Sequence, residues 1–565
     1  HWVFFFINDL INICNKDLLI LEDSITTQVI KGIVLDEEGN PLPFTAVVVE
    51  GTNIGSETKE DGSFSFNYKN NFNNNGKDIR DIKLVVSHIG YETKKIKVNP
   101  FVSDVGIIKL KRISNVLDEY VITATKELQP LKNVTLHTKL INRKKIEQIN
   151  PPDLTSLLQY ELPGIQFGNH HGSGLPTLTY QGVQGNYILF LVDGEKMSGE
   201  GAVDNIDFNR LDIANIERIE VVGGAMSTMY GSNALGGVIN IITKDVDKPF
   251  VLDFNTRLST LRVQSYSLNF GTKLKKFSSN SYIGYRYKAP YKLEDQKEDQ
   301  EIVINEDGSI DTTTIQMRAM ALRGYRIWNA SQKFNYKANE KLNFGLVGTF
   351  YHNQLQNYDS LSKSNKLNYD YSITANTEYK FNDKHKLDFS YSLDNYWKNV
   401  FFINTNKTRT DYSDINNTVR LNYNTKMFDN SVIIAGVEFN NEVLKHYMFA
   451  DSGKHSYHNV VFYMQEERKM LENLTLLTGI RFDVHSIYKL HVTPRINLMW
   501  KLNNFTIRGG YASGFRSPTL KELYSEYDMG GLGMFIIRGN PNLKPELGHN
   551  FNLSGVYNKG IFYTS

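Results

Sequence analysis

The second half of the chain alternates apolar and polar residues over many runs. In LTGIRFDVHS, Ile480, Phe482 and Val484 share one face of an extended strand, while Arg481 and Asp483 share the other. HVTPRINLMWKL and FTIRGGYAS repeat the pattern on either side of an Asn-Asn turn. Runs of about 10 residues match the length of a tilted strand that crosses a membrane. We therefore predict that the apolar face meets lipid and the polar face meets water, so that changes at Arg481 should be mild.

A soluble β-sandwich would show the same period of two, so further features must decide between the two folds. The mean hydropathy is −0.37, and no run approaches the roughly 18 apolar residues of a transmembrane helix. This excludes a helical membrane protein and leaves a transmembrane β-barrel open. About 15 candidate strands follow residue 247. Trp and Tyr near the strand ends fit the aromatic girdle of such a barrel.

The pattern changes between residues 135 and 246, where helical and extended signals alternate. Three leucines of DLTSLLQYE repeat at helical spacing, and a Pro-Gly pair ends that helix. DFNRLDIAN predicts a short helix, and IERIEVVGG predicts a strand that leads into a glycine-rich stretch and a Tyr-Gly-Ser-Asn turn. Glycine supplies positive φ and close backbone approach. We therefore expect the chain to fold back, so that Val238–Ile242 pairs with Ile219–Val222 in a compact mixed sheet.

Residues 28–111 predict a small all-β domain. Short β-branched runs alternate with turn signals such as Asp61-Gly62, which precedes SFSF. The spacing of the turns predicts a sandwich of about seven strands, close to the smallest size that folds alone.

Composition and motif spacing exclude several functions. Lys+Arg number 63 against 61 Asp+Glu, so the chain lacks the basic bias of a nucleic-acid-binding protein. The single cysteine, Cys14, rules out an intrachain disulfide and a CxxC zinc site. None of the 13 histidines precedes a glutamate at the H-x-x-E spacing of a carboxypeptidase zinc site. We therefore expect neither catalytic nor metal-binding residues.

Three segments resemble the TonB-dependent outer-membrane receptors. G-x-V-x-D-x-x-G-x-P-L-P and T-x-x-D-G-x-F-x-F are similar to the carboxypeptidase-regulatory-like domain that precedes the plug in many of these receptors. L-V-D-G, I-E-R-I-E-V-V-x-G and Y-G-S-N-A-L-G-G-V-I-N-I-I-T-K resemble the plug itself. The plug motif residues are Arg218, Glu220, Tyr230, Gly231, Gly236 and Gly237. Gly223 departs from the family, which usually has a lysine or a similar residue there.

The resemblance implies a mainly β fold, in which an Ig-like sandwich precedes an α+β plug inside a transmembrane antiparallel β-barrel. We assign five parts: an N-terminal segment with the remnant of a signal peptide (1–27), the carboxypeptidase-regulatory-like β-sandwich (28–111), a linker with the TonB box (112–134), the plug (135–246) and the barrel (247–565). Plugged transporters have about 22 strands. We therefore expect a barrel truncated at its C-terminus, lacking about seven strands and on the order of 150 residues.

A short β-prone segment before the plug resembles the TonB box, which these receptors present to the periplasmic energy-transducing protein. Its residues are Glu119, Tyr120, Val121, Ile122, Thr123, Ala124 and Thr125. An exposed extended segment can pair with a partner's sheet edge through backbone hydrogen bonds. An ordinary linker strand is the alternative, and the position directly before the plug favours the box.

The resemblance implies a transport receptor of the outer membrane, not an enzyme, with its N-terminal domain in the periplasm. The expected partners are the TonB-ExbB-ExbD complex, outer-membrane lipid and a small iron-containing ligand, while a surface lipoprotein that caps the barrel stays open. Ligand binding would shift the box towards exposure, and energised rearrangement of the plug would then open a path. A structural or adhesive surface β-protein is the alternative from another class, although it would need neither plug motifs nor a box.

Haem is the predicted transported ligand, and no resident cofactor is expected. Two adjacent imidazoles, His170 and His171 of GNHHGSG, could reach axial positions on haem iron, although a solvated polar loop is the alternative. GFRSPTLKELY and GNPNLKPE resemble the FRAP and NPNL elements of the family, with motif residues Phe515, Arg516, Pro518, Asn540, Pro541, Asn542 and Leu543. The histidine that usually lies between these elements in haem receptors is absent. A siderophore or cobalamin receptor therefore remains the alternative.

Overall fold

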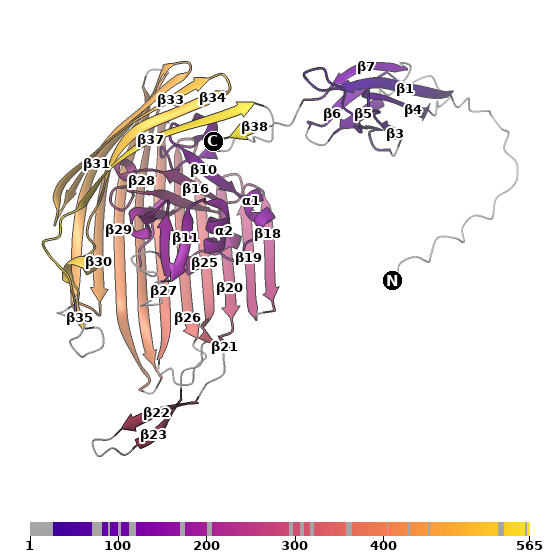
Figure 1. The fold of residues 1–565 in the computed structure, drawn as a ribbon. Coiled ribbons are helices and arrows are strands. Elements are labelled where there is room, and N and C mark those ends of the chain that lie inside the picture. Colours follow the sequence, from indigo (N-terminus) through magenta and orange to yellow (C-terminus); the bar gives the residue numbers. More distant parts are fainter. Residues whose placement is uncertain are drawn as a thin grey trace. The chain divides into compact units, whose positions relative to one another are not determined.

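A computed structural model gives the fold in two units, His1–Glu119 and Tyr120–Ser565, which are described separately (Figure 1). It describes residues 26–564 except for these positions: 53, 71–81, 89–90, 100–102, 112–119, 170–175, 200–205, 261, 293–297, 305–309, 317–320, 357–363, 404, 428–429, 450–452, 529–535 and 560–561. Cys14, Glu119, His170 and His171 thus lie outside the described residues.

The first unit is a β-sandwich of two sheets, with the strand orders β4-β1-β7 and β3-β2-β5-β6. Its strands are β1 (Thr26–Leu35), β2 (Ala46–Val49), β3 (Gly55–Glu57), β4 (Ser63–Asn70), β5 (Ile82–Ser87), β6 (Lys94–Val98) and β7 (Asp104–Lys109). Val34, Val47 and Leu84 lie in its buried core. Gly62 forms the turn before β4 with a φ of +75°, and a Cβ there would lie 2.5 Å from the carbonyl oxygen of Val34. The predicted sandwich is confirmed.

The second unit begins with a plug whose five-stranded sheet has the order β10-β16-β17-β14-β15. The strands are β10 (Thr138–Asn142), β14 (Ile188–Val192), β15 (Glu195–Lys196), β16 (Ile216–Gly223) and β17 (Gly237–Thr243). β14 and β17 run parallel, and the other pairs run antiparallel. Ile219 pairs with Ile241, and Val222 pairs with Val238. The predicted pairing across the glycine-rich turn, and the mixed sheet, are therefore confirmed.

Short helices and a small second sheet complete the plug. The helices are α1 (Arg143–Ile149), α2 (Leu154–Glu161) and α3 (Ser227–Tyr230), and β11 (Ile165–Asn169), β12 (Pro176–Tyr180) and β13 (Val183–Gln184) form a three-stranded sheet. In place of the predicted helix over DFNRLDIAN there are two 3-10 turns, η3 (Phe208–Arg210) and η4 (Ile213–Asn215). Asp207 and Asp212 cap the two turns separately, which explains the interruption. No helix among the described residues is long and apolar enough to cross a membrane.

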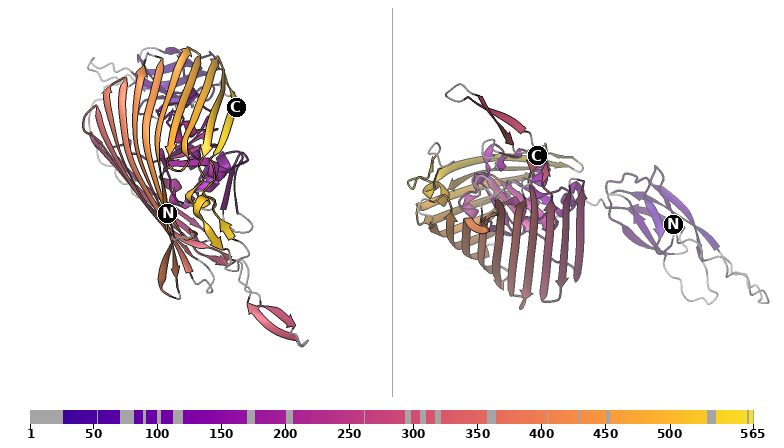
Figure 2. Two further views of the ribbon diagram at one scale, coloured as in Figure 1. Left: turned by 90° about the vertical axis from the view of Figure 1, so that its left-hand side faces the viewer. Right: turned by 90° about the horizontal axis from the view of Figure 1, so that it is seen from below.

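The rest of the unit is one curved, antiparallel sheet of 15 strands, and the plug lies against its concave face (Figures 1 and 2). The strands, in order, are β18 (Phe250–Ser259), β19 (Val263–Lys273), β20 (Phe277–Lys288), β25 (Gly324–Lys337), β26 (Leu342–Gln356), β27 (Ser364–Asn382), β28 (His385–Phe402), β29 (Lys407–Met427), β30 (Ser431–His446), β31 (Lys454–Leu471), β32 (Leu474–His485), β33 (Lys489–Leu502), β34 (Phe505–Arg516), β37 (Glu546–Lys559) and β38 (Phe562–Thr564).

The two ends of the sheet differ in their connections. Tight turns such as Asn503-Asn504 join the strands at one end. The other end carries the long connections, which hold β21 (Tyr291–Lys292), β22 (Glu298–Ile304), β23 (Ile310–Gln316), β24 (Ala321–Leu322), α4 (Leu520–Tyr524), β35 (Glu526–Asp528) and β36 (Ile536–Arg538). Outer-membrane barrels have short periplasmic turns and long extracellular loops. By this rule the first end corresponds to the periplasmic side of such a barrel and the second to its extracellular side.

The burial of the strands confirms the predicted faces. Phe482 is 37% exposed on the convex face, whereas Arg481 and Asp483 are each 1% exposed on the concave face. The mild effect expected of changes at Arg481 assumed a solvated side chain, and this premise does not hold, because the guanidinium is buried against the plug. The effect of a change there stays a prediction. The Arg481 guanidinium donates to Asp483 at 2.8 Å, and a Cβ on Gly231 of the plug would come within 2.7 Å of it.

The lipid-facing assignment can be tested at Phe482. Phe482→Arg should cost about 2–4 kcal/mol of unfolding free energy, because the guanidinium would enter the hydrocarbon near the midplane. Phe482→Leu keeps an apolar side chain and should cost much less. Unfolding titrations in lipid vesicles measure the difference. Equal stabilities of the two variants would reject the orientation.

Candidate functional site

The described part of the box segment begins at Tyr120, which is 46% exposed, and its residues 121–125 are buried or half-buried between the plug and the barrel wall. β8 (Tyr120–Val121) pairs with β9 (Gln129–Pro130), and Val121 and Ala124 belong to a core cluster that also holds Leu477 of the barrel. The expectation of an exposed segment does not hold in this structure. Residues that were expected to form a linker are instead part of the packed unit.

Thr123 is held by three side chains of the plug, Glu220, Asn240 and Tyr230, which we call the box clasp. Glu220 accepts hydrogen bonds from the backbone N–H groups of Ile122 and Thr123 at 2.8 and 2.9 Å and from the Thr123 hydroxyl at 2.7 Å. The Asn240 amide donates to the same hydroxyl at 2.9 Å, and the Tyr230 hydroxyl donates to the Thr123 carbonyl at 2.9 Å. Every polar group of Thr123 therefore has a partner.

Glu220 and Tyr230, two residues of the plug motif, thus gain a role that the sequence did not reveal. Charged residues alternate with apolar ones in IERIEVV, yet Glu220 is fully buried because the box segment covers its face of β16. Arg218 donates to the second carboxylate oxygen of Glu220 at 2.8 Å. Gly231 has a φ of +78°, which a residue with a side chain rarely adopts. Gly236 and Gly237 lead into β17.

Lys126, which follows the box segment, reaches the barrel wall. Its amine donates to the Tyr463 hydroxyl at 3.1 Å and lies 4.4 Å from the centre of that ring. Burial lowers the pKa of the Lys126 amine well below its ordinary value, and Arg420 lowers it further. Burial raises the pKa of the next residue, Glu127, and the charges of Lys386 and Lys426 oppose this rise. Both lysines lie at the periplasmic ends of their strands, β28 and β29. The box segment therefore sits at the periplasmic end of the lumen.

Acidic residues of the barrel hold the extracellular side of the plug. Arg210 pairs with Asp370 at 2.8 Å and with Asp394 at 2.9 Å. Burial alone would lower the pKa of Arg210, but the two carboxylates outweigh it and raise that pKa. Asp394 also accepts from the Ser198 hydroxyl at 2.6 Å, and Asp414 accepts from the Gly199 N–H at 3.1 Å. These contacts fix the loop that follows β15.

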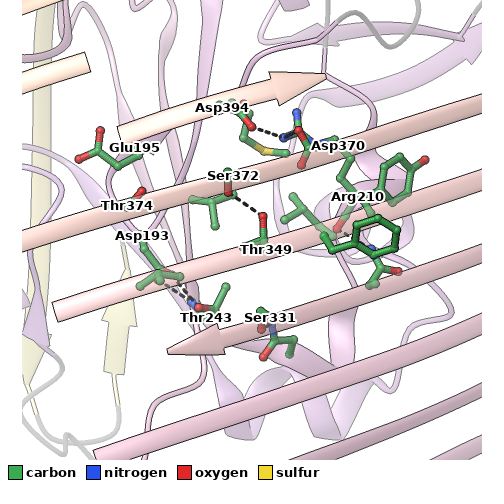
Figure 3. Close-up of a pocket in the computed structure, with 18 of the residues that line it drawn as sticks. Asp193, Glu195, Arg210, Thr243, Ser331, Thr349, Asp370, Ser372, Thr374 and Asp394 are labelled. Atoms are coloured by element: carbon green, nitrogen blue, oxygen red, sulfur yellow. Dashed lines mark hydrogen bonds and ion pairs between the residues drawn. The ribbon is translucent and has the colours of Figure 1, made fainter. Parts of the chain in front are cut away.

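Three cavities separate the plug from the concave face of the barrel. The apical cavity is lined by Tyr412, Tyr457, His485 and Phe515, among others. Both the plug and the barrel contribute polar side chains to the wall of the middle cavity, including Asp193, Arg210, Ser331, Ser372 and Thr374 (Figure 3). The lower cavity is lined by Ile122 and Lys126 near the box segment. Together they suggest a route along the plug.

The FRAP-like motif of the barrel meets the glycine-rich turn of the plug at the apical cavity. The N–H of Phe515 donates to the Ser227 hydroxyl at 3.3 Å, and the Asn233 N–H donates to the Phe515 carbonyl at 3.3 Å. Arg516 pairs with Glu522 of α4 at 3.0 Å and with Glu546 at 2.5 Å. The long motif of the plug and the FRAP-like motif of the barrel therefore form one contact.

The remaining motif residues support the loop around α4. The Pro518 carbonyl accepts from the Tyr488 hydroxyl at 3.0 Å. The Asn540 N–H donates to the Glu522 carbonyl at 3.0 Å, and the Leu543 N–H donates to the Asn540 carbonyl at 3.1 Å. Pro541 and Asn542 lie between these two and complete the turn, in which the Asn542 N–H donates to the Asn540 side chain at 3.0 Å. Among the described residues, no group of three or more histidines, cysteines or carboxylates could hold a metal ion.

The box clasp can be tested by removing its carboxylate. Glu220→Ala should free the box segment, because hydrogen bonds to a charged group contribute about 1.5–3 kcal/mol each. Thiol labelling of Thr125→Cys in a Cys14→Ser background should then become at least about tenfold faster, as 1.4 kcal/mol is a factor of ten. Glu217→Ala, on the same strand but outside the clasp, is the control. An unchanged labelling rate in Glu220→Ala would contradict the clasp.

Comparison with known proteins agrees with the domain order. Three family models match the chain: "CarboxypepD_reg-like domain" over residues 30–122, "TonB-dependent Receptor Plug Domain" over 130–238, and "TonB dependent receptor-like, beta-barrel" over 306–565. The solved ferric enterobactin receptor PfeA of Pseudomonas aeruginosa has the same fold, with a TM-score of 0.62 at 18% identity over 78% of this chain and 71% of that one.

Two curated relatives come from Vibrio cholerae. The iron-regulated outer membrane virulence protein is 27% identical over 463 residues, which are 78% of this chain and 66% of that protein. The vitamin B12 transporter BtuB is 25% identical over 453 residues, which are 77% of this chain and 67% of that protein. The chain thus spans about two thirds of the length of these relatives. With its plug and barrel motifs matched in order, the chain belongs to the TonB-dependent receptors, an outer-membrane family of receptors rather than enzymes.

Proposed function

We propose that this receptor imports a scarce iron-related small molecule across the outer membrane and that the box clasp controls its coupling to energy. The ligand binds in the apical cavity, and the box segment then leaves the clasp and pairs with TonB of the TonB-ExbB-ExbD complex. The observation that carries this proposal is the position of Thr123, which lies in the clasp at the periplasmic end below three cavities. Because the N-terminal sandwich precedes the box segment in the sequence, we also propose a periplasmic location for it.

The lining of the apical cavity suits a ligand that carries both apolar and charged or polar groups. Its wall combines the aromatic rings of Tyr412, Tyr457 and Phe515 with the ammonium group of Lys521 and the carboxylate of Asp414. The names of two similar proteins fit such a ligand, since one is a vitamin B12 transporter and the other is a ferric enterobactin receptor. A ferric siderophore fits this combination best.

The described histidine of this cavity is poorly suited to ligate haem iron. Nδ1 of His485 accepts hydrogen bonds from the N–H groups of Ile487 and Tyr488 at 3.1 and 3.3 Å. In a neutral imidazole the other nitrogen then carries the proton and is a donor. Ligation of haem iron therefore depends on His170 and His171, which lie outside the described residues. Haem as the transported ligand stays a prediction. No contact bears on a surface lipoprotein, which also stays a prediction.

Energy coupling can be tested at Val121. Val121→Pro should abolish uptake of ferric enterobactin while the surface still binds it, because proline removes a donor needed for strand addition to TonB. Val121→Ala keeps the N–H and should retain uptake. Radioactive iron accumulation and surface binding are measured on the same cells. Undiminished energy-dependent uptake by Val121→Pro would sink the assignment of the box.

The haem alternative can be tested in a titration that also includes ferric enterobactin and cyanocobalamin. If His170 and His171 ligate iron, the His170→Ala/His171→Ala double variant should lose haem affinity by at least about tenfold, or 1.4 kcal/mol. It should also lose the Soret shift that ligation produces. His549→Ala, outside both motifs, is the control. The same haem affinity and spectrum in wild type and double variant would reject haem ligation by this pair.

A further inference from the structure

One hairpin of the plug separates the three cavities. It comprises the end of β14, the Asp193-Gly194 turn and β15. Glu195 lines all three cavities, Asp193 lines the middle and lower ones, and Lys196 lines the apical and middle ones. A ligand that moves from the apical to the lower cavity must therefore pass this hairpin.

The hairpin lies at the edge of the plug sheet and is held largely by polar contacts. β15 is an edge strand that pairs only with β14 among the described strands. Asp193 and Gly194 have φ values of +50° and +88°, as a two-residue type I′ turn requires. Side chains attach the turn to the barrel, where Asp193 pairs with Lys333 at 2.9 Å and Glu195 pairs with Arg420 at 2.8 Å. Within the plug, the Asp193 carboxylate also accepts from the Thr243 N–H at 2.9 Å and from the Thr243 hydroxyl at 2.7 Å. Such polar contacts can be exchanged for water when the hairpin moves.

A single buried amide connects this turn to the box segment. The Asn240 amide donates to the Thr123 hydroxyl at 2.9 Å, and its carbonyl oxygen accepts from the Gly194 N–H at 3.1 Å. The orientation of the amide follows from its partners. The Thr123 hydroxyl gives its proton to Glu220 and can only accept from Asn240, whereas the Gly194 N–H can only donate. Asn240 is only 1% exposed.

We propose that Asn240 is a positioning residue that couples the box segment to the Asp193-Gly194 hairpin, so that withdrawal of Thr123 loosens the hairpin and joins the middle cavity to the lower one. This inference rests on the proposed transport function. When Thr123 leaves, the Asn240 amide loses its acceptor in a buried site, which is unfavourable. Rotation towards water restores a partner but breaks the bond to Gly194. The turn then loses the Gly194 anchor and keeps the ion pairs with Lys333 and Arg420 and the hydrogen bonds of Asp193 within the plug.

Thr123 offers an isosteric test of the coupling. A spin label on Lys196→Cys in a Cys14→Ser background reports the motion of β15. Thr123→Val removes the hydroxyl while keeping the shape of the side chain, and Asn240→Leu removes the amide without touching Glu220. Both should raise the fraction of mobile label at least about threefold in purified receptor without ligand or TonB. Thr123→Ser restores the hydroxyl and should return the label to the parental state.

Thr125→Val is the matched control, because Thr125 is a buried β-branched residue of the same segment without a bond to Asn240. In Thr125→Val the mobile fraction of the spin label should equal that of the parent. The coupling would be overturned if Thr123→Val left the mobile fraction unchanged, or if Thr125→Val raised it as much as Thr123→Val does. If Asn240→Leu fails to fold, Thr123→Val and its serine rescue decide alone. Uptake of ferric enterobactin by the parent is measured separately: a failure there rejects the proposed function and leaves the label result intact.

Discussion

The structure depends on one constraint, that every backbone polar group facing lipid must be paired within the sheet. Between its two edge strands the 15-stranded sheet satisfies it through continuous antiparallel pairing, and it leaves lipid only the apolar half of each strand. Charged side chains such as Arg481 and Asp394 are thereby confined to the concave face. Taking charges out of water is costly unless they are paired. The plug therefore has to present matching groups, and its Arg210 and Glu195 do so.

The parts of the fold that depend on neighbouring residues were predictable from sequence. The period of two placed Phe482 towards lipid, and the glycine-rich turn predicted the pairing of Val222 with Val238. The contacts of the site were not predictable, since they join distant residues. Glu220 and Thr123 are 97 positions apart, and a polar residue in an alternating strand gives no sign that another segment will cover it. The burial of Arg481 was missed for the same reason, because the plug segment that covers it is distant in the sequence.

The proposed function rests on how the clasp and the cavities share residues. Asn240 belongs to the clasp and also supports the hairpin between the cavities. Glu220 and Tyr230 were recognisable as motif residues, but the motif did not show what their side chains bind. In the structure they bind the backbone of the box segment, because a buried segment needs partners for its N–H and C=O groups as long as it is not bound elsewhere. A receptor that releases this segment must therefore supply another acceptor, and the edge of a partner sheet provides one.

Amide hydrogen exchange at Ile122 and Thr123 tests the central claim most directly, because both N–H groups donate to the buried Glu220. The measurement compares intact receptor in lipid alone with receptor saturated with ferric enterobactin, cyanocobalamin or haem. The account predicts slow exchange in the resting receptor and clearly faster exchange with the ligand that binds. Exchange in the resting receptor as fast as in a free peptide, or no change on binding any of the three ligands, would contradict it.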